Sequence, residues 1–122
     1  MFVVEIKSND RIIVRKASTK DLKEIVYALV SLVPIGKVTS YKAIASLLGI
    51  HHRLVARFMA LNDKPIIIPC HRVVMSDGSL GGYSRGGKVV KEKILRLEGV
   101  NVVNGKVLKK HRKINLVIHC LR

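Results

Sequence analysis

The residues best suited to chemistry are Cys70 and His71, in the segment Pro69-Cys70-His71-Arg72-Val73. A cysteine attacks as its thiolate, so a reactive cysteine needs a neighbouring base or positive charge, which His71 or Arg72 could supply. The apolar run 66–68 precedes the segment, and Pro69 cannot donate to a strand ladder. We therefore predict a strand over 66–68 that ends at a nucleophilic Cys–His pair. The same pattern is open to a second interpretation, a buried structural cysteine beside solvated basic residues.

The elements that must position this pair begin with a β-hairpin. Apolar and polar residues alternate over 2–7 and 11–15, on either side of the turn 8–10, and we expect this hairpin to close one side of the core. Ser18 or Thr19 can cap a following helix over 20–33. Apolar residues recur in that helix at the spacing of one buried stripe: Leu22, Ile25, Val26, Leu29 and Leu32.

Two short helices, 41–48 and 51–61, follow around the turn Gly49-Ile50, with Thr39 or Ser40 as the first cap. Their pairing in a strongly basic chain suggests a helix-turn-helix. The second helix has a basic face of small residues at helical spacing, made of Arg53, Ala56, Arg57 and Ala60. Alanines allow close approach to a DNA groove while arginines reach phosphates or bases. A solvated amphipathic helix of a small core is the alternative.

A glycine- and serine-rich loop occupies 76–87, and a loop of this length in a compact domain is usually functional or disordered. A helix is expected over 88–98 with Val90, Ile94 and Leu97 inward. Asn104-Gly105 predicts a second hairpin turn. The basic run 109–113 is expected to be a solvated edge and 114–121 a last strand, in which Cys120 is structural.

The composition describes one domain with a polyanionic partner. The chain has 122 residues and a formal charge of +15, which argues for nucleic acid or an anionic membrane surface. Its longest apolar stretch, 25–35, is too short to span a bilayer, and no signal-peptide pattern opens the sequence. Two distant cysteines make no disulfide framework, so we expect a reducing, cytoplasmic setting.

At several points the sequence closely resembles the catalytic domain of O6-alkylguanine-DNA alkyltransferases (methylated-DNA–protein-cysteine methyltransferases). The matching pieces are 35–41 (Ile-Gly-Lys-Val-Thr-Ser-Tyr), 68–74 (Ile-Pro-Cys-His-Arg-Val-Val), Gly82-Tyr83-Ser84, Gly86-Gly87, Lys91-Glu92 and Leu97-Glu98-Gly99. The resemblance implies a mostly α fold with small β elements: a winged-helix-like helix-turn-helix DNA-binding domain with an N-terminal β-hairpin and a C-terminal hairpin and tail. We expect one domain over 1–122, divided into the hairpin 1–17, the core 18–100 and the C-terminal part 101–122.

The resemblance also implies a role for each matching residue. Cys70 would accept the alkyl group, His71 would act through a water as its base, and Glu98 would orient that histidine. Tyr83 would donate a hydrogen bond to the guanine oxygen. The pocket would be lined by Met59, Ser84 and the Val73 backbone, with Asn62 as a hinge. The residues expected to contact DNA are Tyr41, Arg53, Arg57, Thr39 and Ser40.

The function implied is direct reversal of DNA damage. After base flipping, an alkyl group would pass from O6-alkylguanine in double-stranded DNA to Cys70, once per protein molecule, with no cofactor and no metal. The alternative is a non-catalytic, alkyltransferase-like protein that binds damaged DNA, although such proteins lack the acceptor cysteine. We expect a monomer without membrane contact. Arg85 looks like an insertion relative to the family, and we expect the family's usual N-terminal domain to be missing.

Overall fold

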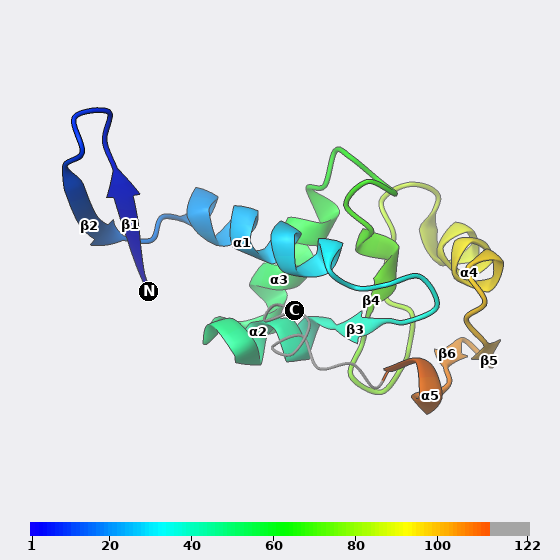
Figure 1. The fold of residues 1–122 in the computed structure, drawn as a ribbon. Helices are drawn as coiled ribbons and strands as arrows, with labels where there is room; N and C mark the ends of the chain where they lie inside the picture. Colours follow the sequence, from blue (N-terminus) through cyan, green and yellow to red (C-terminus); the bar gives the residue numbers. More distant parts are fainter. Residues whose placement is uncertain (113–122) are drawn as a thin grey trace.

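A computed structural model describes residues 1–112 of the chain. The order of elements along the chain is a hairpin, three helices, a short turn that carries Cys70, a fourth helix, a second hairpin and a last helical turn (Figure 1). This is the mostly α architecture with small β elements that the sequence predicts. None of the helices within 1–112 is long and apolar enough to cross a membrane.

The N-terminal hairpin forms as predicted but does not close the core. Strands β1 (Phe2–Ile6) and β2 (Ile12–Lys16) pair in antiparallel register. They stand at the far end of α1, away from the other helices (Figure 1). No hairpin residue belongs to either hydrophobic cluster. Alternating apolar and polar residues indicate a strand with one apolar face, but they do not indicate whether another element covers that face.

The first helix, α1 (Thr19–Ser31), begins at a capping box in which Ser18 and Asp21 satisfy each other's backbone N–H groups. It buries Val26, Leu29 and Val30, whereas the expected stripe residue Leu32 is 41 % exposed. The Tyr27 hydroxyl donates to the Phe58 carbonyl at 2.7 Å, which ties α1 to α3.

The predicted helix pair is present as α2 (Tyr41–Leu48) and α3 (His52–Ala60). Ser40 caps α2, and Gly49 ends it in the left-handed conformation at φ 67°. In α3 the residues turned to the core are Val55, Phe58 and Met59. Leu61, expected on the apolar side, is 58 % exposed because the helix ends at Ala60.

The predicted strand over 66–68 is wrong. Ile66 adopts φ 73°, which a β-branched residue rarely does, and the segment makes only an isolated bridge between Pro65 and Ile68. Ile66 and Ile67 are exposed by 56 % and 77 %. The three isoleucines therefore form an irregular loop between two prolines, and they are not a buried strand.

A short parallel sheet divides the core into two clusters. Strand β3 (Thr39–Ser40) pairs with β4 (Val73–Val74). Successive strand residues face opposite sides. Val73 accordingly packs in the cluster of α1, α2 and α3, and Val74 in the cluster that α4 and the second hairpin complete.

The C-terminal part packs against that second cluster. Helix α4 (Gly87–Leu97) buries Lys91 and Leu95, whereas Leu97, expected inward, is 87 % exposed. Strands β5 (Val102–Val103) and β6 (Lys106–Val107) form the predicted hairpin around Asn104-Gly105.

The basic run 109–113 is only partly a solvated edge. Helix α5 (Lys109–Arg112) buries His111, whose Nδ1 lies 2.9 Å from the Gly36 carbonyl and whose Nε2 accepts from the Asn101 backbone at 3.1 Å. The expected strand over 114–121, with Cys120, lies outside the described residues.

Candidate active site

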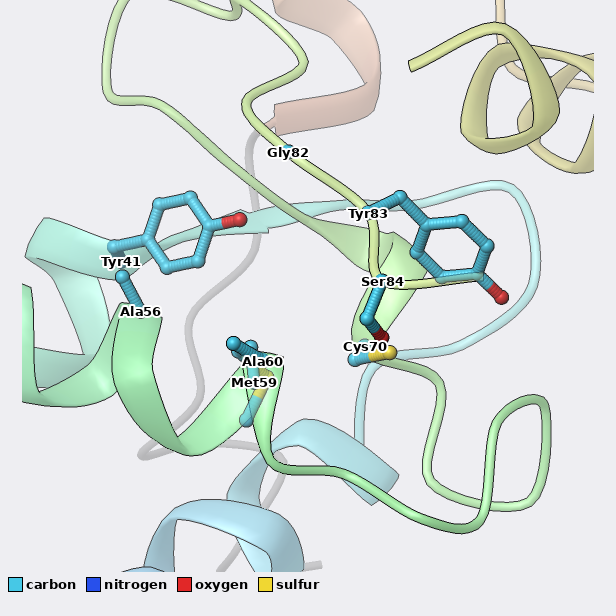
Figure 2. A pocket seen from close by; sticks show the side chains of 8 residues that line it. All are labelled: Tyr41, Ala56, Met59, Ala60, Cys70, Gly82, Tyr83 and Ser84. Atoms are coloured by element: carbon cyan, nitrogen blue, oxygen red, sulfur yellow. The ribbon is translucent and has the colours of Figure 1, made fainter. Parts of the chain in front are cut away.

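Cys70 lies at the wall of a pocket of about 390 Å³ between α3 and the 80–84 loop. It opens the 3₁₀ turn η1 (Cys70–Arg72), directly before β4, and is only 5 % exposed. Figure 2 shows its sulfur beside the Ser84 side chain, with Met59 across the pocket. The lining consists of Tyr41, Ala56, Met59, Ala60, Cys70, Gly82, Tyr83 and Ser84. A thiol is thus presented to a mostly apolar cavity large enough for a small ring system.

His71, Glu98 and Arg72 form one hydrogen-bonded group behind Cys70. The Nε2 atom of His71 lies 2.9 Å from Glu98 Oε1. Arg72 donates to both oxygens of the same carboxylate, from Nε at 3.0 Å and from Nη2 at 2.6 Å. Its Nη1 donates to the Val33 carbonyl at 2.8 Å, beyond the end of α1. Arg72 is therefore the residue that fixes Glu98.

The environment favours a neutral histidine and an ionised glutamate. Burial lowers the pKa of His71, and the nearby Glu98 opposes this only in part. Burial alone would raise the pKa of Glu98, but hydrogen bonds and charge from Arg72 and His71 outweigh it and lower that pKa. A neutral His71 that donates Nε2–H to Glu98 carries its lone pair on Nδ1. Nδ1 is buried and has no hydrogen-bond partner among residues 1–112.

A buried lysine shapes the opposite side of the pocket. Lys91 of α4 is fully buried, and its Nζ donates to the carbonyls of Val73 at 2.7 Å, Leu80 at 2.5 Å and Gly82 at 3.3 Å. It also donates to the Tyr41 hydroxyl at 3.4 Å. Burial lowers the pKa of Lys91 to about 8 and raises that of Tyr41 to about 12. Lys91 therefore ties β4, the 80–82 loop and α2 together.

Asn62 connects α3 to the Cys70 turn. Its Nδ2 donates to the Ile68 carbonyl at 2.9 Å, and its Oδ1 accepts from the Lys64 backbone at 3.0 Å. The same Ile68 carbonyl accepts from the Cys70 backbone N–H at 2.7 Å. Asn62 is 3 % exposed, so its hydrogen bonds form a buried link between the end of α3 and the turn that carries Cys70.

A second cavity of about 530 Å³ adjoins the first and extends it over the start of α3. The two share Tyr41, Ala56 and Gly82, so the Cys70 pocket continues into a surface groove. Gly81, at φ 71°, lets the loop approach Tyr41, since an added Cβ would lie 3.3 Å from the hydroxyl. The groove is lined by Tyr41, Lys42, His52, Arg53, Ala56, Met75, Ser76, Gly81 and Gly82.

Six of the thirteen predicted site residues, among them Cys70, Tyr41 and Arg53, line one or both of these cavities. Met59, Ser84 and Tyr83 line the pocket, and the Tyr83 hydroxyl is directed away from Tyr41 (Figure 2). Val73 and Asn62 are buried and line neither cavity. The residues predicted to touch DNA differ in their exposure. Arg53 and Arg57 are exposed on α3, whereas Thr39 is only 4 % exposed within β3. Ser40 caps α2, and Tyr41 lines both cavities.

Sequence reasoning missed several residues around the site. Lys91 appeared only as part of a matching motif, because a lysine on a helix is usually solvated. Arg72 was left without a specific role, although the chain has only eight Asp and Glu residues with which its cations can pair. Lys42, His52, Met75 and Ser76 of the groove carried no signal. Within residues 1–112, no three His, Cys, Asp or Glu side chains are grouped so that they could hold a metal ion.

The fold and the site define a small helix-turn-helix DNA-binding domain that carries a cysteine in a pocket beside its second helix. Residues 21–100 match the family model described as 6-O-methylguanine DNA methyltransferase, DNA binding domain. The chain belongs to this family of DNA-repair proteins.

Named relatives and solved structures agree with this assignment. A methylated-DNA–protein-cysteine methyltransferase of Pyrobaculum aerophilum is 55 % identical over 67 residues, covering 55 % of this chain and 45 % of the relative. The Rattus norvegicus protein of the same name is 42 % identical over 80 residues, covering 64 % of this chain and 38 % of the relative. The chain thus spans less than half the length of these curated relatives.

Among solved structures, the O6-methylguanine-DNA methyltransferase of Pyrococcus kodakaraensis is 39 % identical, with a TM-score of 0.59 over 64 % of this chain and 46 % of that one. S. pombe Atl1, in complex with damaged DNA containing O6-carboxymethylguanine, has a TM-score of 0.71 and covers 81 % of this chain and 100 % of its own. At 24 % identity, Atl1 shows a shared fold.

Proposed function

We propose that this protein repairs double-stranded DNA by moving an alkyl group from O6 of a flipped guanine to Cys70. The observation that carries the proposal is the group behind the pocket. Glu98 holds a neutral His71 through Nε2, the buried Nδ1 of His71 has no partner among residues 1–112, and the adjacent Cys70 lies at the pocket wall. Cys70, His71 and Glu98 thus supply a nucleophile, the base that deprotonates it and the carboxylate that orients the base.

The reaction starts when Nδ1 of His71 accepts the Cys70 proton through a bridging water. The thiolate then attacks the alkyl carbon, so an S–C bond forms as the C–O6 bond breaks and the guanine oxygen leaves with the electron pair. The proton taken from Cys70 replaces the alkyl group on guanine, and Tyr83 donates a hydrogen bond to the oxygen. A thioether on Cys70 has no route to cleavage within this site, so each molecule reacts once.

Binding of the damaged strand uses the groove along α3. Arg53 lines this groove and would fill the space that the flipped base vacates. Arg57 and the Ser40 cap at the start of α2 would contact phosphates, and Tyr41 would turn the nucleotide toward Cys70. Extrusion costs a few kcal/mol, less for a damaged pair.

The test is the mass of the protein after incubation with duplex DNA that contains O6-methylguanine. A gain of one methyl group on Cys70, limited to one per molecule and absent in Cys70→Ala, supports transfer. Alkyl-dependent binding with no gain in mass would favour the second candidate, a damage-binding protein that does not react. The fold shared with Atl1 favours that candidate, and the presence of Cys70 argues against it.

A further inference from the structure

The N-terminal hairpin carries an uncovered apolar face that the proposed repair reaction does not use. In the register of β1 and β2, Val4 pairs with Val14, and Ile6 pairs with Ile12. Together with Phe2, these side chains project from one face, because alternate strand residues share a side. All five are 62–74 % exposed.

The other face of the hairpin fixes this orientation. It carries Glu5 and Arg15, which form an ion pair. Arg15 also holds Asp21 at the start of α1 through two hydrogen bonds, Nη1 to Oδ2 at 2.5 Å and Nη2 to Oδ1 at 3.0 Å. Since the polar face is the one bound to α1, the apolar face points away from the rest of the described residues, 17–112.

Such a face is unusual for an isolated hairpin. A two-stranded hairpin is only marginally stable in water unless a further strand or packing covers its hydrophobic side. At the observed exposures, the five side chains present roughly 600 Å² of apolar surface, which is at the upper end of what monomers leave uncovered.

We propose that this face binds the same face of a second copy of the chain, forming a two-fold dimer in which two hairpins stack. The face is self-complementary: it is apolar except for Lys16 at its end, and the hairpin's other charges lie on the opposite face or the turn. Two copies would bury at most about 1,200 Å² in total, the lower limit for a specific interface, so the dimer is expected to be weak and concentration-dependent. This departs from the monomer expected from the sequence.

The dimer leaves the repair site accessible. No hairpin residue lines the Cys70 pocket or the groove along α3. The proposal is therefore independent of the proposed alkyl transfer, and either can fail without the other.

Sedimentation equilibrium of the full chain tests the proposal, at micromolar to millimolar protein and moderate salt to screen its charge. The expected mass rises with concentration from 13.6 kDa toward twice that value. In Val4→Glu/Val14→Lys, the opposite charges keep a cross-strand pair while the face loses its apolar centre. The dissociation constant should rise at least about tenfold, because four valines per dimer lose their burial.

Val3→Thr is the matched control, since Val3 lies on the opposite face and the dimer should persist. Amide NMR shows whether the charged pair unfolds the hairpin. If it does, Val4→Thr/Val14→Thr replaces it in the test, because threonine is also β-branched and keeps the strands paired. A mass of 13.6 kDa at every concentration overturns the proposal. So does a dimer that survives both double variants, or one lost in Val3→Thr.

Discussion

Glu98 receives hydrogen bonds from two neighbours in the same 3₁₀ turn, His71 and Arg72. This arrangement separates the two tasks of the carboxylate. Arg72 keeps it ionised and in place, while His71 uses it to hold Nε2–H and so leaves Nδ1 as the basic nitrogen. The rate of transfer should therefore follow the neutral fraction of His71.

The pH dependence of transfer should show this directly. Because burial lowers the pKa of His71 below its usual 6.5, the single-turnover rate should fall to half of its plateau only below pH 6.5, where His71 becomes protonated. Glu98→Gln removes a charge that raises the pKa of His71, so the acid limb should move to lower pH while the plateau falls roughly tenfold or more.

Glu92→Gln on α4, the helix that Glu98 follows, is the matched control, since the partly exposed Glu92 carboxylate pairs with Arg96 at 3.6 Å and, among residues 1–112, with no other cation. Labelled duplex substrate between pH 5 and 9 gives both profiles. An acid limb that stays in place in Glu98→Gln would mean that Glu98 does not act through His71.

The lowered pKa of Lys91 predicts how the stability of the fold depends on pH. Its pKa of about 8 in the folded protein lies below the 10.5 of the unfolded chain, so between these values the unfolded chain binds more protons. The free energy of unfolding should consequently rise from pH 8 upward, by at most about 3 kcal/mol for a shift of this size. Tyr41, with a pKa of about 12 against 10.0, acts in the opposite sense above pH 10.

Urea denaturation at pH 7.5 to 10 measures this rise in wild type and Lys91→Met. The rise should vanish in the variant, while Lys88→Met, an exposed neighbour on α4, should retain it. A wild-type protein whose stability is flat across this range would show that Lys91 keeps an ordinary pKa in the fold.

At the scale of elements, the link between α3 and the Cys70 turn rests on one side chain. Asn62→Ala removes two hydrogen bonds and leaves the buried Ile68 carbonyl with only the Cys70 N–H. Unfolding free energy should fall by about 2–3 kcal/mol, and transfer should slow because Cys70 loses its fixed position. Asp63→Ala, one residue further and exposed, should change neither. Urea midpoints and single-turnover rates of both variants measure these effects. Equal values for the two variants would show that Asn62 does not link α3 to the Cys70 turn.

The elements also show which features local sequence can predict. Periodicity and caps located α1 to α4 to within about two residues, and Asn-Gly located the second hairpin. The run Ile66–Ile68 misled because β-branched residues usually indicate a strand, whereas here Asn62 holds the loop and Ile66 takes a positive φ. On α4, Leu97 is exposed although it was expected inward, and Lys91 is buried because carbonyls of β4 and of the 80–82 loop, both outside the helix, surround its ammonium group.

The candidate site was predictable to the extent that it matched a motif. Cys70, His71 and Glu98 belong to the motif, and the structure places His71 against Glu98. The N-terminal hairpin had no such guide. Its alternation indicated an apolar face, and the location of that face depends on the Arg15–Asp21 contact, which no local pattern encodes.

For the whole molecule, the charge of +15 implies that DNA affinity falls steeply with salt, whether or not the DNA is damaged. Charge alone cannot therefore show which residues recognise damage. Arg57, exposed on α3, should behave as a phosphate contact. Arg57→Ala should weaken binding to damaged and undamaged duplex alike and reduce the slope of log K against log salt by about 1. Salt titrations on both duplexes measure this, and a loss confined to damaged DNA would contradict it.

Arg53 differs from Arg57 in its place, because it lines the groove that adjoins the Cys70 pocket, whereas Arg57 lines neither cavity. If it fills the space left by a flipped base, it lowers the cost of extrusion, which applies only to a base held in a duplex. Arg53→Ala should then slow transfer from duplex DNA roughly tenfold or more, while transfer from the free O6-alkylguanine base stays unchanged. Arg11→Ala, on the hairpin turn, is the charge-matched control and should leave both rates as they are. A parallel loss on duplex and free base would place Arg53 in the chemistry of the pocket, and no loss on either would remove it from base flipping.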